Sequence, residues 1–213
     1  MNNKIVKIEF FHDVLCAWCY VLSPRVKKLV EKYPDNINLV HRAFALAPSP
    51  KSLEYIFNDK DTAKKEILNH WREANNYDDE HRINAELMAS RNFDYPYSMP
   101  GLCACKAAEL QSGNAMFGLM MDRVQKAHLT ECLDITKDEV LAMCAKDIGL
   151  DVDKWLEDFK SDKVRDLLLD DLAIARKYGV NSVPTLVAND GKSKFIGAQP
   201  YEALENWFLS LLK

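Results

Sequence analysis

Two cysteines, Cys16 and Cys19, stand where a strand pattern gives way to a helix pattern. The preceding run, KIVKIEFF from Lys4 to Phe11, is apolar, β-branched and aromatic over the length of a strand. After the cysteines, apolar side chains recur at the spacing of one helix face, at Leu22, Val26, Leu29 and Tyr33. A C-x-x-C pair carried from a strand into a helix restricts the fold more than any other feature of the chain.

The start of a helix gives this pair a chemical role. Unpaired N–H groups and the positive end of the helix dipole stabilise a thiolate, which is the reactive form of cysteine. We therefore expect Cys16 to be the nucleophile and Cys19 to close a disulfide with it or to resolve a mixed disulfide. The alternatives are two inert core cysteines or half of a zinc site. No second C-x-x-C or C-x-x-H pair in the sequence completes four zinc ligands, so we expect no metal.

The patterns that follow alternate between sheet and helix. Ile37–Phe44 alternates as a second strand, and the order strand–helix–strand implies a parallel pair. From Pro48 to Phe159 only helical patterns occur, and Thr136 with Glu139 forms a capping-box pattern there. The chain therefore predicts an α/β sheet that is interrupted by a helical insertion.

The C-terminal part completes the sheet. Gly179 is placed to end a helix, and Asn189, Asp190 and Gly191 form a turn between two strand patterns, which predicts an antiparallel hairpin. The predicted elements are a helix over Asp162–Tyr178, strands over Thr185–Ala188 and Lys194–Ile196, and a helix over Tyr201–Leu212.

Composition excludes several classes of protein. The chain carries 28 Lys plus Arg against 32 Asp plus Glu, a formal net charge of -4, and no basic run, so nucleic acid is not an expected partner. No stretch approaches the ~18 apolar residues of a membrane span. The start, MNNKIVKIEFFHDV, lacks the pattern of a signal peptide, and we expect a cytoplasmic protein. Six cysteines are too few for a disulfide-built secreted scaffold.

Several of these features together resemble a known family. The order strand–C-A-W-C–helix, Pro24 after the cysteines and Ser182-Val183-Pro184-Thr185 before the hairpin are similar to a thioredoxin fold, and the long helical insertion is similar to its DsbA-like branch. Within that branch, HDVLCAWCYV and GVNSVPTLVANDGKSKFIGAQPYEAL look most like the FrnE-like dithiol-disulfide oxidoreductases or isomerases. The resemblance implies an α/β thioredoxin fold, a mixed central sheet with flanking helices, formed by residues 1–47 and 160–213, with 48–159 as an inserted helical domain.

The resemblance also implies roles for single residues. Pro184 would be a cis-proline that faces the cysteines, and the backbone of Val183 would pair with an extended substrate segment. The Ala17-Trp18 dipeptide differs from the Pro-His of DsbA and the Gly-Pro of thioredoxin, which leaves oxidant, reductant and isomerase open. Many FrnE-like relatives carry Ala-His where this chain has Cys105-Lys106, so no role of that histidine transfers.

Three residues near the pair are further candidates for the site. Asp13 either accepts a proton from a cysteine or caps the local turn. Glu9 is either a partly buried proton acceptor for Cys19 or a solvent-facing residue on an edge. Trp18, between the cysteines, is expected at the exposed helix start, where it can contact an apolar side chain of a substrate.

The insertion carries its own candidates. Cys103 and Cys105, with His128 and Cys132, are a conceivable metal or second redox site, but C-x-C within a helix turns its two thiols to different faces. Cys144 lies on an apolar stripe and is expected in the core. Three aromatic residues either line a groove or belong to the core, namely Trp71, Tyr95 and Tyr97.

Three functions follow. The first is a thiol-disulfide oxidoreductase that acts on protein thiols and disulfides, or on glutathione as a small co-substrate, through mixed disulfides and without a metal or nucleotide. The second is a redox-sensing adaptor, because CACKAAELQS, DEVLAMCAKDIGLDVDKWLEDFKSDKV and VPTLV are similar to the YjbH-like adaptor proteins. The third is a small-molecule enzyme like the kappa-class glutathione transferases and hydroxychromene-carboxylate isomerases, whose active position is usually a serine. Oligomeric state stays open.

Overall fold

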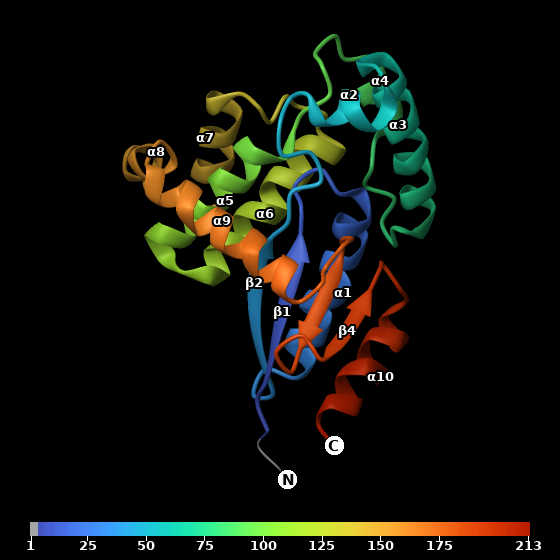
Figure 1. The fold of residues 1–213 in the computed structure, drawn as a ribbon, viewed down its shortest axis with the longest axis vertical. Helices are drawn as coiled ribbons and strands as arrows, with labels where there is room; N and C mark the ends of the chain where they lie inside the picture. The colour runs from blue at the N-terminus through green and yellow to red at the C-terminus, as the bar shows by residue number, and fades with distance from the viewer. Residues whose placement is uncertain (1–3) are drawn as a thin grey trace.

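The computed structural model describes residues 4–213, and within them four strands form one mixed sheet in the order β2-β1-β3-β4 (Figure 1). β1 runs parallel to β2 and antiparallel to β3, and β3 runs antiparallel to β4. The strands are β1 (Val6–His12), β2 (Ile37–Ala43), β3 (Thr185–Ala188) and β4 (Ser193–Ile196). The predicted fold class, parallel pair and C-terminal hairpin are confirmed.

Helices connect and cover these strands. α1 (Ala17–Lys32) joins the parallel strands, while α9 (Asp162–Lys177) and α10 (Tyr201–Leu211) flank the C-terminal hairpin. The predicted helical insertion, residues 48–159, holds α2 (Ser52–Phe57), α3 (Lys60–Tyr77), α4 (Ala85–Ala89), α5 (Ser98–Ser112), α6 (Asn114–Gln125), the π-helix η1 (Lys126–Thr130), α7 (Asp138–Asp147) and α8 (Val152–Phe159). No helix within residues 4–213 is long and apolar enough to cross a membrane.

The predicted capping box is wrong. α7 begins at Asp138, after Lys137, and no side chain caps its first turn. The Thr136 hydroxyl instead donates to Asp134 Oδ1 at 2.6 Å, and the same oxygen accepts from the Thr136 amide at 3.0 Å. Thr136 thus belongs to a local turn with Asp134 and lies one residue before the N-cap position, which Lys137 occupies.

The sheet is covered on both faces. On one face, Leu22 and Leu29 of α1 and Phe208 of α10 pack with Ile8 and Phe10 of β1. On the other face a smaller cluster is formed by Phe11 of β1, Ala175 of α9, Val180 of the loop after α9 and Val187 of β3. A sheet buried on both faces explains why KIVKIEFF has no clean alternation of apolar and polar residues.

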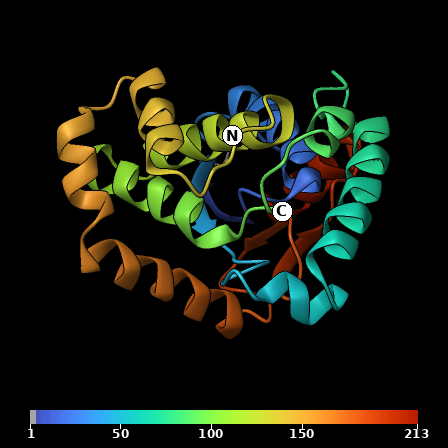
Figure 2. The ribbon, with the colours of Figure 1, turned by 90° about the horizontal axis from the view of Figure 1, so that it is seen from above.

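The helical insertion packs on the end of the sheet that carries the cysteines (Figures 1 and 2). Its apolar core includes Val14, Leu15 and Ala17 from the segment around Cys16, together with Leu102 of α5 and Met121 of α6. The turn that carries the cysteines is therefore packed into the core of the insertion.

A buried ion cluster also joins the insertion to the sheet. Asp171 of α9 is 1% exposed, and its carboxylate accepts from Arg42 of β2 at 2.9 Å and from Lys106 of α5 at 2.6 Å. It also accepts from the amide of Ala43 at 2.9 Å. Arg42 in turn binds Glu9 of β1 at 2.9 Å. One carboxylate thus neutralises cations from two separate elements.

We predict that Asp171→Ala lowers the free energy of unfolding by about 3–5 kcal/mol, because it leaves two largely buried cations, Arg42 and Lys106, without their shared partner. Asp170→Ala is the matched control, since its side chain is exposed on the same helix. Urea unfolding of both variants measures the difference. Equal stability of the two variants would contradict the role assigned to the cluster.

Candidate functional site

Cys16 lies at the start of α1. Its backbone is extended, with φ -81° and ψ 103°, and its Sγ accepts a hydrogen bond from the amide of Cys19 at 3.1 Å, so the thiol itself caps the helix. Cys16 therefore lies at a helix N-terminus, as the sequence predicts. Cys16 as a residue is 6% exposed, and Cys16 and Cys19 are both free cysteines.

The segment before β3 faces this thiol. Cys16 Sγ lies 3.6 Å from the carbonyl oxygen of Val183, to which a protonated thiol donates. The Val183–Pro184 peptide is cis, as the resemblance implies. Because β3 pairs with β1, the sheet itself brings residue 183 to the cysteines across 167 positions of sequence. The pairing of Val183 with a substrate strand stays a prediction.

Cys19 lies beneath Cys16 and is fully buried. Burial raises the pKa of its thiol well above the usual value, and the hydrogen bond with Cys16 and the charge of that residue raise it further. The negative charge of Asp13 acts in the same direction. Cys19 therefore needs a proton acceptor before it can attack a disulfide.

Asp13 is fully buried beside the pair. Its Oδ1 accepts from the amide of Leu15 at 3.0 Å, and its Oδ2 accepts from the amide of Leu46 at 2.6 Å and from the hydroxyl of Ser98 at 2.7 Å. Burial raises its pKa from 3.8 to about 6, against these hydrogen bonds, which lower it. The bond to Leu15 is the local turn contact that the sequence suggested, and the proton-transfer role stays a prediction.

The two other candidates near the pair lie in different surroundings. Trp18 is half-buried and packs against the ring of Tyr77, with centroids 5.4 Å apart. Glu9 is 2% exposed, so it is not the solvent-facing residue of the second interpretation. Its carboxylate is held by Arg42 at 2.9 Å and Lys7 at 3.2 Å. Glu9 thus belongs to the buried ion cluster.

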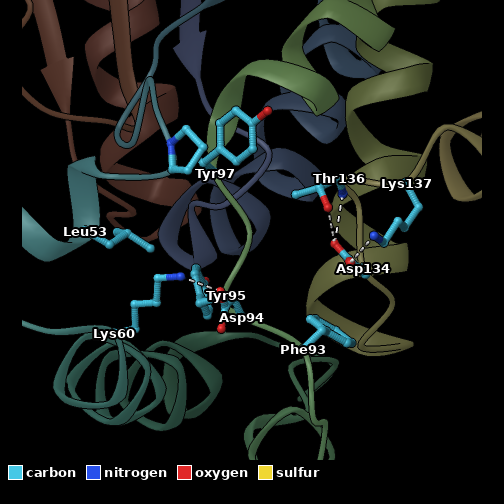
Figure 3. A pocket seen from close by; sticks show the side chains of 10 residues that line it. Leu53, Lys60, Phe93, Asp94, Tyr95, Tyr97, Asp134, Thr136 and Lys137 are labelled. Atoms are coloured by element: carbon cyan, nitrogen blue, oxygen red, sulfur yellow. Dashed lines mark hydrogen bonds and ion pairs between the residues drawn. The ribbon is translucent and has the colours of Figure 1, made fainter.

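A cavity of about 330 Å³ opens in the insertion next to the site (Figure 3). Figure 3 shows two ion pairs at its edges, Lys60 with Asp94 at 2.6 Å and Lys137 with Asp134 at 3.9 Å. The wall residue Tyr97 directly precedes Ser98 in the sequence, and the Ser98 hydroxyl binds Asp13 of the active-site turn. Its apolar lining is Pro50, Leu53, Phe93, Tyr95 and Tyr97.

The cysteines of the insertion occupy separate environments. Cys105 and Cys144 are fully buried in the apolar core, which confirms the prediction for Cys144. Cys103 is half-buried, and Cys132 donates to the carbonyl oxygen of Asn84 at 3.2 Å. Within residues 4–213 no three His, Cys, Asp or Glu side chains gather as metal ligands.

His12 and His128 are buried and His41 is partly buried, and sequence reasoning singled out only His128. His12 Nε2 lies 3.3 Å from His41 Nδ1, and the two rings stack at 5.1 Å. His128 Nε2 lies 3.0 Å from the hydroxyl of Tyr95, which also accepts from Trp71 at 3.1 Å. Burial lowers the pKa of His12 well below the usual value, that of His41 to about 4 and that of His128 to about 3.

Sequence reasoning also missed two polar residues of the insertion that reach the active-site turn. Ser98 binds the Asp13 carboxylate, and Gln125 Nε2 donates to the Asp13 carbonyl at 2.9 Å. Both are fully buried. Apart from a polar residue inside a helical pattern, no local signal marks either one, since their partners lie 85 and 112 positions away.

Comparison with known proteins identifies the class to which this fold and site belong. The family model described as the DSBA-like thioredoxin domain matches residues 7–208. The chain therefore belongs to that family, and its fold is a DsbA-like thioredoxin fold.

Individual relatives carry different names. The ClpXP adapter protein SpxH of Bacillus licheniformis is 29% identical over 99% of this chain and 68% of its own. A protein described as a candidate disulfide isomerase from Nitrosomonas europaea has a TM-score of 0.79 at 18% identity, with 98% of each chain covered. The cytosolic disulfide reductase DsbM from Pseudomonas aeruginosa, also solved with GSH, has a TM-score of 0.63 at 20% identity, with 97% of each chain covered.

We predict that stability falls as the pH drops from 7 to 5. The folded-state pKa of His128 is lower than its unfolded value of 6.5, so its contribution is complete above pH 6.5 and is lost as the pH falls toward about 3. Asp13, with a raised pKa, acts in the opposite direction between pH 3.8 and about 6, but three histidines outweigh one carboxylate.

His128→Gln should reduce this loss by about 2 kcal/mol, because the variant has no imidazole to protonate. Urea unfolding at pH 5 and pH 7 measures it, and His70→Gln on the exposed face of α3 is the control. Identical pH dependence in the two variants would contradict the assignment.

Proposed function

We propose that this protein is a thiol-disulfide oxidoreductase that works through Cys16 and Cys19. The observation that carries the proposal is the position of the Cys16 Sγ, at a helix N-terminus, 3.1 Å from the Cys19 amide and 3.6 Å from the Val183 carbonyl. Membership of the DSBA-like thioredoxin domain family supports it.

The reaction is a two-step exchange. The Cys16 thiolate attacks a sulfur of the substrate disulfide, which forms a mixed disulfide and releases one substrate thiolate. Cys19 then attacks the Cys16 sulfur, which forms the Cys16–Cys19 disulfide and releases the second thiolate. The substrate gains two electrons and the pair loses two. Oxidation of a substrate dithiol is the same sequence in reverse.

The second step needs a proton acceptor. Cys19 is buried and its pKa is raised, so its proton must leave before its sulfur can attack. Asp13 is the group that suits this role, because it is buried in the same site and its pKa of about 6 leaves it mostly ionised at neutral pH. The proton then passes to the released thiolate or to solvent.

Two surfaces suit a substrate. The backbone of the half-buried Val183, just before β3, offers polar groups to an extended segment, in the way a strand is added to a sheet. The aromatic cavity beside the active-site turn has the size of a small-ligand or side-chain site. Protein thiols and glutathione both fit this arrangement. The solved complex of DsbM with GSH supports glutathione as a substrate. A cytoplasmic location is consistent with both.

A second candidate function is an adaptor for the ClpXP protease. The relatives named SpxH match 92–100% of this chain, and the identities lie below 30%. One surface feature favours this alternative, since Tyr55 and Ile56 of α2 are 84% and 60% exposed. Such an apolar pair is suited to contact another protein.

We predict that the wild type catalyses the reduction of insulin by dithiothreitol, and that Cys16→Ser lowers the rate to that of dithiothreitol alone, because the attacking thiol of the proposed pair is then absent. Cys103→Ser is the matched control, since its half-buried thiol lies outside the site and its loss should leave the rate unchanged.

The potential of the Cys16–Cys19 pair in glutathione buffers decides the direction. A value near about -270 mV indicates a reductant, and one well above about -200 mV an oxidant or isomerase. If the wild type and Cys16→Ser are equally inactive, the exchange function is wrong. Binding of the chain to purified ClpXP then becomes the measurement that tests the adaptor.

A further inference from the structure

One side chain of the insertion reaches the buried carboxylate of the site. Ser98 is the first residue of α5, is fully buried, and donates to Asp13 Oδ2 at 2.7 Å. Its oxygen also accepts from the amide of Ala47 at 2.9 Å. A hydroxyl has a single proton, and the Ala47 amide occupies a lone pair of the oxygen, so the proton is directed at Asp13.

The other groups around Asp13 do not offer an adjustable donor. The amides of Leu15 and Leu46 are fixed by the backbone, and the amide of Gln125 from α6 binds the main-chain carbonyl instead. The titratable groups that sense the charge of Asp13 are Cys19 from α1 and Tyr95 from the segment before α5, and the negative charge of Asp13 disfavours ionisation of both.

We propose that Ser98 is a positioning residue through which the helical insertion keeps Asp13 ionised near neutral pH, and so sets the pH range in which the buried Cys19 can release its proton. The second half of this inference rests on the proposed exchange function. The first half, the control of Asp13 by Ser98, does not.

The proton balance of the step is simple. Asp13 takes the proton of Cys19 as the Cys19 sulfur bonds to the Cys16 sulfur, and the bond between Cys16 and the substrate sulfur breaks. A hydroxyl that donates to the carboxylate favours its charged form. Without that donor the pKa of Asp13 is higher. Asp13 then stays protonated, and cannot accept the proton of Cys19, until the pH exceeds that higher pKa.

The test uses Ser98→Ala in the full chain, with Ser98→Thr as the variant that retains a hydroxyl. The first readout is the pH titration of the Asp13 carboxyl by infrared difference spectroscopy, with the band assigned by its absence in Asp13→Asn. The midpoint should lie near pH 6 in the wild type and about one pH unit higher in Ser98→Ala. In Ser98→Thr the midpoint of the Asp13 titration should return to that of the wild type.

The second readout is the reaction with dithiobis-nitrobenzoate in a Cys103→Ser background. Cys16 releases the first nitrothiobenzoate, and the attack of Cys19 releases the second in a phase that does not depend on reagent concentration. At pH 6 this second phase should be about fivefold slower in Ser98→Ala, and the two proteins should converge above about pH 8. The control Ser112→Ala, exposed at the far end of α5, should match the wild type at every pH.

The outcomes separate the two claims. An unshifted carboxyl titration in Ser98→Ala overturns the role of Ser98, and so does a second phase that is slower by the same factor at every pH, which indicates general damage to the fold. A shifted titration with an unchanged second phase overturns the link to Cys19. If the wild type shows no second phase at all, the exchange function fails, while the titration still decides whether Ser98 controls Asp13.

Discussion

The hydrogen bonds to the buried carboxylate of Asp13 are the contacts on which the rest of the site depends. Burial of a carboxylate is costly unless hydrogen bonds compensate it, and here the donors come from three segments: the active-site turn, the loop after β2 and the start of α5. The carboxylate thus joins these three segments. The insertion is therefore part of the active-site wall. The insertion and the active-site turn also pack closely at Gly101 of α5. A Cβ at this position would lie 2.8 Å from a methyl group of Val14.

This arrangement connects packing with reactivity. Cys16 receives an amide hydrogen bond at the helix start, while Cys19 is fully buried, which disfavours its thiolate. The two sulfurs of one motif thus have opposite environments, as sequential attack and resolution require. Asp13 lies at the boundary between them, and the hydrogen bonds of its carboxylate decide how readily it holds a proton.

Local patterns predicted most of the fold. The C-x-x-C pair at a strand-to-helix junction, the parallel strands, the helical insertion and the hairpin around Asn189-Asp190-Gly191 follow from periodicity and turn chemistry between near neighbours. The capping box failed because α7 begins one residue later than the pattern requires, after Lys137, and Thr136 forms a turn with Asp134 instead. Ser98, Gln125 and the pairing of Glu9 with Arg42 could not be predicted, since each contact depends on how distant segments fold together.

The most direct test of the account is to trap the first covalent step. Cys19→Ser, incubated with a peptide disulfide, should accumulate a mixed disulfide that mass spectrometry of a digest assigns to Cys16, because the residue that resolves it is absent. The same treatment of Cys16→Ser should give no such adduct. An adduct found only on Cys103, or none in Cys19→Ser, would contradict the claim that Cys16 is the nucleophile of an exchange reaction.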